Sequence, residues 1–231
     1  MNLLETADNV LLTVHIVAGI ISLALFWVPV LSRKGGVNHR RYGVIYVKLM
    51  SAVVISAAVM SVLNVIAGEI SRAIFLGFLA LLTAKPLWLG IEVLATKKQT
   101  SAAYKRKSIA LNGLLSVSGF ALIIYGITLL GEDVAFLMLA FGGLGLLGVP
   151  ELIGLTREQV ANADRPKAWL ASHIRDMIIS GIAAYTAFLA FGANELTSGL
   201  FTGALVMVPW LAPTVTGSLG IAYATIRFTR V

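Results

Sequence analysis

The sequence predicts an all-α protein: a polytopic membrane bundle of about seven transmembrane helices, with the N-terminus outside and the C-terminus in the cytoplasm. Of its 231 residues, 58% are hydrophobic and 13% charged, and the mean hydropathy is +0.89. Soluble domains carry about 25% charged residues. The apolar residues form blocks of about 20 or more, the length that a helix needs to cross about 30 Å of hydrocarbon. The segments between these blocks alternate in charge, which is typical of a multi-pass protein.

The seven expected helices follow from the apolar blocks and from the polar and helix-breaking residues between them. They cover residues 9–32, 42–67, 70–96, 106–130, 133–154, 167–192 and 198–228. The first block lacks a basic N-terminal region and a small-residue cleavage site, so we expect a retained helix and not a signal peptide. Together the spans predict a single seven-helix domain over residues 1–231.

The charge of the connections predicts the orientation in the cell inner (plasma) membrane. Seventeen of the 18 Lys and Arg lie on one side or in its half of the spans, and Arg72 lies opposite. By the positive-inside rule this basic side is cytoplasmic. The net charge of +7 is then a matter of topology, and it favours contact with the anionic headgroups of the lipid bilayer over a nucleic-acid partner.

Ionisable residues inside the expected spans gather in the cytoplasmic half. At the centre of a spanning helix, a charged side chain costs about 2.5–3.5 kcal/mol on the insertion scale. We expect a polar pocket that binds a ligand or relays protons, with the candidate residues Lys85, Glu92, Glu151, His173 and Asp176. The alternative is that some of these side chains only reach the headgroups, as Glu92 beside Lys97 would.

Helical periodicity divides the charged residues of the stretch SHIRDMIISG between two faces. Residues three, four and seven apart share a helix face, which places His173, Asp176 and Ser180 together. Arg175 is rotated about 200° from His173 by the same periodicity. We therefore expect His173 and Asp176 in the pocket with Lys85 and Glu151, and Arg175 at the headgroups.

Two further histidines lie outside this pocket in the sequence. His15 sits in the outer half of the first span, where a hydrogen-bonded core histidine is the simpler interpretation. His39 and Arg40, with Arg41, precede the second span, where backbone N–H groups at a helix N-terminus also favour an anion. This loop is expected either to bind a phosphate or carboxylate or to act only as the positive-inside anchor.

A pattern at the N-terminal end carries a resemblance to a known family. In HIVAGIISLALFWVPVLSRKGGVNHRRYGVIYV, a histidine with a glycine four residues on is followed by a His-Arg-Arg-x-Gly-x-x-Tyr run, at His15, Gly19, His39, Arg40, Gly43 and Tyr46. The chain resembles the prokaryotic integral membrane proteins grouped as domain of unknown function 2306 (DUF2306). The resemblance covers about 40 residues and implies a multi-pass membrane protein, without implying a reaction.

Three functions remain open from the sequence. The first is binding or transport of a small, anionic or lipid-like ligand, or proton relay, through the cytoplasmic pocket. The second is a haem- or metal-binding redox protein, for which the three histidines allow at most one two-histidine haem. The third is a membrane enzyme acting on a lipid-like substrate, with His173 as acid or base oriented by Asp176.

Two compositional features complete the prediction. The chain has no cysteine, which excludes disulfides, iron–sulfur clusters and thiolate metal sites. The stretch FGGLGLLG places Gly142, Gly143, Gly145 and Gly148 in the fifth span. Small residues let helix backbones approach closely in lipid, so we expect this span to pack tightly against a neighbouring helix or against a second copy in a homo-oligomer.

Overall fold

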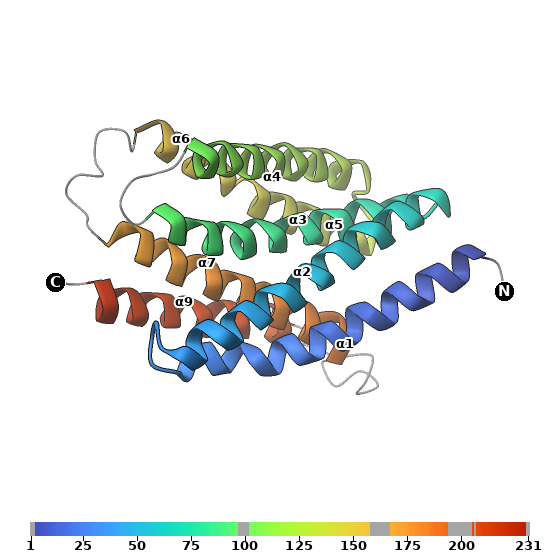
Figure 1. Cartoon of the computed structure of the whole chain (residues 1–231). Helices are drawn as coiled ribbons and strands as arrows, with labels where there is room; N and C mark the ends of the chain where they lie inside the picture. The colour runs from blue at the N-terminus through green and yellow to red at the C-terminus, as the bar shows by residue number, and fades with distance from the viewer. Residues whose placement is uncertain (1–2, 97–101, 158–166, 194–204, 206, 230–231) are drawn as a thin grey trace.

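The computed structural model describes residues 3–96, 102–157, 167–193, 205 and 207–229, and Figure 1 shows their course. These residues form helices and contain no strand, which confirms the all-α fold class. The helices are α1 (Leu3–Leu31), α2 (Val37–Ile66), α3 (Ile70–Glu92), α4 (Ala102–Thr128), α5 (Asp133–Gly145), α6 (Gly148–Arg157), α7 (Ala168–Ala187) and α9 (Val208–Thr229). A 3₁₀ turn, η1 (Val93–Thr96), continues α3, and a π-helical turn, η3 (Phe188–Ala193), continues α7.

Six helical stretches are long and apolar enough to cross a membrane. They are Thr6–Leu31, Val37–Ile66, Ile70–Thr96, Ala102–Thr128, Val134–Gly154 and Ala168–Ala193. The chain thus has the helices of a multi-pass membrane protein. The expected seventh span, 198–228, begins outside the described residues. Parts of the basic connections, at 97–101 and 158–166, also lie outside them. The described part of that span is α9, which is not among the six but packs against α7.

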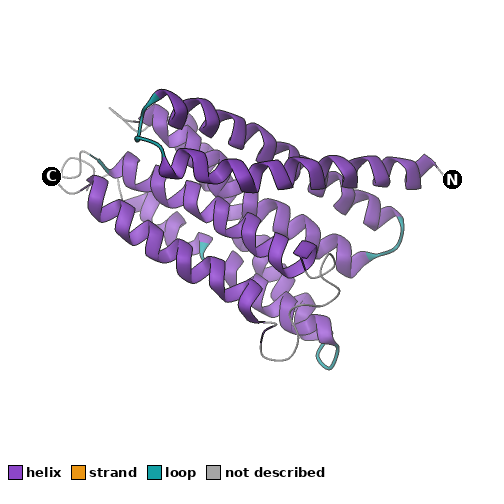
Figure 2. Cartoon of the chain, turned by 90° about the horizontal axis from the view of Figure 1, so that it is seen from below, coloured by secondary structure: helices purple, strands orange, loops and turns teal. Residues whose placement is uncertain are grey.

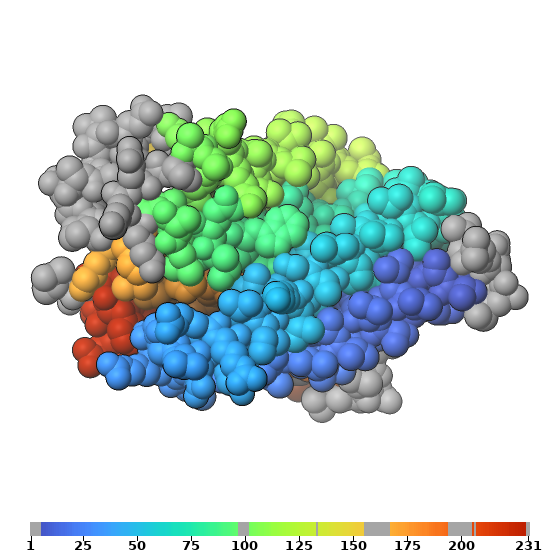
Figure 3. All heavy atoms as spheres, in the orientation of Figure 1, coloured from blue at the N-terminus to red at the C-terminus, as the bar shows by residue number. Residues whose placement is uncertain are grey.

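The helices run up and down along a common axis, with the chain ends at opposite ends of the bundle (Figures 1 and 2). Helix α3 is central, because it packs against α2, α4 and α7. Helix α1 lies along α2, and α4 is covered by α5 and α6. The space-filling view shows α1 and α2 side by side on one face, with α3 and α4 beyond them (Figure 3).

Two apolar clusters hold the bundle together, and α3 contributes to both. One cluster joins α1, α2 and α3 through Phe26, Tyr46 and Leu87. The other joins α3, α4 and α5 through Phe78, Leu122 and residues around them. Since lipid tails are as apolar as these side chains, the association depends on close packing more than on the hydrophobic effect.

Helix α7 differs from the other membrane-length helices in having no large apolar side chain that is fully exposed. Large apolar side chains are exposed on α1 to α6, as in Val117 of α4 at 69% and Phe136 of α5 at 66%. None of the exposed large apolar side chains in the described chain lies on α7. It packs against α3 and α9, and its polar residues Asp176 and Ser180 are buried.

Glycines bring α5 and α6 against α4. A Cβ on Gly145 would lie 2.6 Å from the Gly119 Cα atom, and one on Gly148 would lie 2.6 Å from Ser116 Oγ. A Cβ on Gly142 would lie 2.8 Å from the Gly119 carbonyl oxygen. The close packing expected of the fifth span is confirmed at these positions, and its neighbour is α4. Gly143 is the exception, with nothing within 4 Å of its Cβ position.

Candidate functional site

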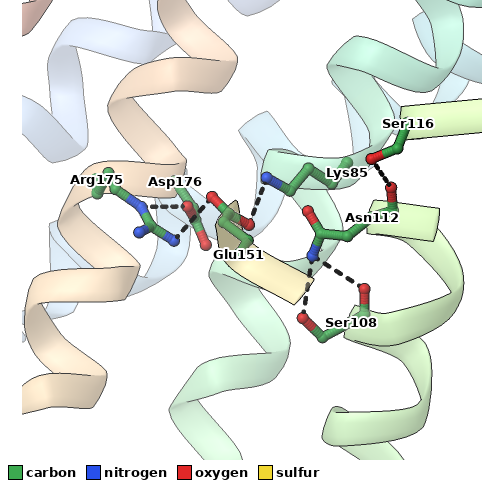
Figure 4. Close-up of polar contacts among 7 residues, drawn as sticks. All are labelled: Lys85, Ser108, Asn112, Ser116, Glu151, Arg175 and Asp176. Carbon is green, nitrogen blue, oxygen red and sulfur yellow. Dashed lines mark hydrogen bonds and ion pairs between the residues drawn. The ribbon is translucent and has the colours of Figure 1, made fainter. Parts of the chain in front are cut away.

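Four charged side chains from three helices meet in a cluster, hereafter the charge cluster: Lys85 of α3, Glu151 of α6, and Arg175 and Asp176 of α7 (Figure 4). Lys85 Nζ lies 2.7 Å from Glu151 Oε2, and Arg175 Nη2 lies 3.7 Å from Glu151 Oε1. Arg175 Nε donates a hydrogen bond of 3.0 Å to Asp176 Oδ1. The Glu151 carboxylate therefore bridges two cations, and the cluster has no net charge.

Three local features of the sequence bring these groups together. Gly90 lets α7 approach α3, because a Cβ there would lie only 3.0 Å from the Asp176 Cβ. The fifth span breaks between α5 and α6, so Glu151 lies in the first turn of a separate ten-residue helix. Pro86 follows Lys85 inside α3 and leaves one backbone carbonyl of that helix without its usual donor.

Two of the three residues expected to share a face of α7 lie together in the interior of the bundle. Asp176 and Ser180 are both buried, and the Tyr46 hydroxyl of α2 lies 3.0 Å from Ser180 Oγ. Ser180 uses its single hydrogen on the Met177 carbonyl, 2.8 Å away, so Tyr46 is the donor to Ser180. The Tyr46–Ser180 hydrogen bond thus links α2 to α7, one helical turn beyond Asp176 of the charge cluster.

The expectation that Arg175 stays apart from the pocket is wrong. Its side chain is 42% exposed, yet it contacts both Asp176 and Glu151. Helical periodicity places the Cα atom correctly, but the long side chain carries the guanidinium group back across the helix surface. The charge cluster therefore contains Arg175 together with three of the four residues expected, and the fourth, His173, is directed to the Gly90 carbonyl.

His39 and His173 each cap the end of a neighbouring helix. His39 Nδ1 lies 2.9 Å from the carbonyl of Pro29 near the end of α1, and His173 Nδ1 lies 2.6 Å from the carbonyl of Gly90 near the end of α3. The last carbonyls of a helix lack intrahelical donors, so each imidazole donates through Nδ1 to such a group. The structure brings the two rings together, with their centroids 6.3 Å apart.

The loop before α2 is turned toward the end of α1. Lys34 Nζ contacts the carbonyls of Pro29 and Val30 and lies 5.8 Å from the ring centre of Phe228. Partial burial lowers the pKa of Lys34, which is unfavourable for its charge, and the carbonyl contacts offset this cost. An open hollow of about 550 Å³ lies over residues 32–38. His39 and Lys34 thus contact the end of α1, and His39 and Arg40 lie in the first turn of α2, which begins at Val37.

Glu92 and His15 lie apart from the charge cluster. Glu92 forms an ion pair with Lys107 of α4 at a partly exposed position, and Lys97, its neighbour in the sequence, lies outside the described residues. His15 Nδ1 lies 3.1 Å from the Val53 carbonyl and 3.0 Å from Ser56 Oγ, so it joins α1 to α2.

Asn112 of α4 lies beside the charge cluster and is not among the candidate residues expected from the sequence (Figure 4). Its side chain has no exposed surface, and its Nδ2 atom donates a hydrogen bond of 2.9 Å to the Ser108 carbonyl. Its Oδ1 atom has no hydrogen-bond partner in the described part of the chain. Figure 4 shows this oxygen on the side of Asn112 that faces Lys85 and Glu151. The signal in the sequence that could have identified Asn112 is an amide side chain in the middle of an apolar block.

The donor atoms of the site limit which cofactors it would suit. Among the described residues, no group of three or more His, Asp or Glu side chains is placed to hold a metal ion. His39 and His173 are placed as a pair, with Nδ1 of each directed to a carbonyl, which is how histidines that bind a metal through Nε2 are commonly oriented. Comparison with family models, with curated proteins and with solved structures gave no match.

Proposed function

We propose that the chain is an inner-membrane protein that binds a small anionic ligand at the charge cluster, in the cytoplasmic half of the bundle, as part of transport or proton relay. The observation that carries the proposal is the bridging position of Glu151 between Lys85 and Arg175. Two cations that share one carboxylate form a site where the carboxylate or phosphate of a ligand can take the place of Glu151.

Stability alone gives a poor account of the cluster. Each charged group costs energy to place within the membrane, and replacing a buried ion pair with apolar residues is often neutral or stabilising. Lys85 is well buried, with 11% of its side chain exposed, and Glu151 lies beside the break between two helices. Interrupted spanning helices are typical of ligand sites in transporters, which supports a binding role.

The orientation is part of the proposal. The basic connections favour a cytoplasmic position for the end of the bundle that carries the charge cluster and the C-terminus. The resemblance to DUF2306 proteins agrees with this general description. Contact with the lipid bilayer follows from the exposed apolar side chains, and a lipid headgroup is one source of the anion.

The test is calorimetric binding of phosphate, sulfate, lactate and propionate to the detergent-purified protein. Lys85→Met should lower the affinity of a bound anion by about tenfold or more, since one charged hydrogen bond is worth about 1.5–3 kcal/mol. The matched control is Lys107→Met, which removes the lysine of the exposed pair with Glu92 and should leave the affinity unchanged. Failure of all four anions to bind, or equal losses in the two variants, would refute the proposal.

A redox protein with one haem is the second candidate, favoured by the His39 and His173 pair. A bound haem would use the two Nε2 atoms as ligands and supply one-electron chemistry. The measurement is the visible absorption spectrum of the purified protein with and without dithionite. A spectrum without haem bands after expression in haem-sufficient cells would eliminate this candidate, and bands that disappear in His173→Ala would establish it.

A further inference from the structure

A buried hydrogen-bond acceptor without a donor lies beside the charge cluster: Oδ1 of Asn112. The donor bond from Nδ2 to the Ser108 carbonyl identifies the two ends of the amide, because a carbonyl can only accept. The free end is therefore the oxygen, and it is an acceptor. Nδ2 also lies 3.3 Å from Ser108 Oγ, so both hydrogen-bond contacts of the side-chain amide are made through its nitrogen.

The position of Asn112 is held by the packing of α4 against α6. Its backbone carbonyl accepts a hydrogen bond of 2.8 Å from Ser116 Oγ. A Cβ on Gly148 would lie 2.7 Å from the same carbonyl, so α6 begins in contact with Asn112. Glu151 follows three residues later, and the amide oxygen points to the side where Glu151 meets Lys85 (Figure 4).

An amide oxygen buried in this way is unfavourable unless a donor reaches it, and the lipid interior offers none. Lys85 of the charge cluster directs its ammonium group to Glu151. A ligand that replaces the Glu151 carboxylate at Lys85 would arrive next to Asn112. An O–H or N–H group on that ligand would then supply the missing donor.

We infer that Asn112 is a specificity residue that accepts a hydrogen bond from the ligand, so that the ligand is an anion with an adjacent O–H or N–H donor. Monoprotonated phosphates and 2-hydroxy or 2-amino carboxylates have this chemistry. Sulfate and simple carboxylates do not have it at neutral pH. The inference rests on the proposed function and narrows its ligand class.

The experiment compares two pairs of anions of similar shape, phosphate with sulfate and lactate with propionate, by calorimetry on the purified protein at neutral pH. In the wild-type protein, at least one donor-bearing anion should bind about tenfold or more tightly than its donor-free partner, because a site built for a hydrogen bond rejects analogues that lack it. Asn112→Leu should remove this preference and leave the affinity of the donor-free anion unchanged. The matched control is Ser118→Ala on the same helix. The Ser118 hydroxyl donates a hydrogen bond to the Leu114 carbonyl of its own helix, so this variant should keep the preference.

Each outcome decides the inference. Binding of donor-bearing and donor-free anions with equal affinity would overturn the role of Asn112 and leave the proposed anion site standing. Binding of none of the four would overturn both. A lower melting temperature of Asn112→Leu with an unchanged preference would mean that the amide serves a bound water only, which also overturns the inference. If Asn112→Leu does not fold, equal affinities within both pairs in the wild-type protein would still overturn the inference. Displacement of phosphate by phosphatidate, but not by phosphatidylcholine, would identify a lipid headgroup as the donor-bearing anion.

Discussion

Replacing Gly145 by Ala tests the contact between α5 and α4. The new methyl group would meet the Gly119 Cα atom at 2.6 Å, the Leu115 carbonyl oxygen at 2.9 Å and Phe78 Cε2 at 3.0 Å. Two of these atoms belong to the backbone of α4 and cannot rotate away. Overpacking of this kind costs about 1–3 kcal/mol. Because the contacts with backbone atoms cannot relax, we expect a cost at the upper end of this range, about 3 kcal/mol. Alanine recovers about 1 kcal/mol through its higher helix propensity, which leaves a net loss of about 2 kcal/mol.

The assay is thermal unfolding in one detergent, followed by tryptophan fluorescence. For a chain of this length, the loss corresponds to a fall in Tm of about 4–8 °C. Gly143→Ala is the matched control, since nothing lies within 4 Å of its Cβ position, and it should leave Tm unchanged or raise it slightly. If the two variants had equal Tm values, the close approach of α5 to α4 would be incorrect.

Three further predictions concern α7 and the topology. Asp176→Ala should lower the unfolding free energy by about 2–3 kcal/mol, less than the roughly 3–5 kcal/mol of a fully buried pair, because Arg175 keeps Glu151 and is partly exposed; an unchanged denaturation midpoint would contradict this. Tyr46→Phe should cost about 1 kcal/mol in the same assay, because Ser180 loses a donor, whereas no change would mean that the hydrogen bond contributes nothing. A fluorescent protein fused to the C-terminus should fluoresce in the cytoplasm. Activity of an alkaline phosphatase fused to the C-terminus would instead show that this end lies outside, which contradicts the predicted orientation.

The sequence predicted the features that depend on helix length and periodicity. Blocks of apolar residues give the positions of the spans, and a spacing of four residues correctly placed Asp176 and Ser180 on one buried face. The fifth span was expected to be continuous, whereas α5 ends at Gly145 and α6 begins at Gly148. Hydropathy does not register this break, because both helices are apolar and the residues between them are leucines.

The partners of polar side chains could not be predicted in the same way. Arg175 joins the charge cluster because its side chain is long enough to reach Glu151, and residue spacing alone contains no such reach. Glu92 pairs with Lys107 of α4, and this pairing depends on how α3 and α4 cross. The cap that His39 provides for α1 likewise depends on how the loop at residues 32–36 folds back.

The lack of exposed large apolar side chains on α7 has a consequence for the biogenesis of the protein. The span that contains α7 has a mean hydropathy of 1.5, the lowest of the six, whose others lie between 1.8 and 2.3. A nascent helix of this kind gains little from entering lipid by itself, and it carries Arg175 and Asp176. Its packing partner α3 and the Glu151 carboxylate of α6 leave the ribosome earlier. The order of synthesis therefore supplies both a counter-charge and a helix surface before α7 requires them, so integration of α7 depends on helices already inserted.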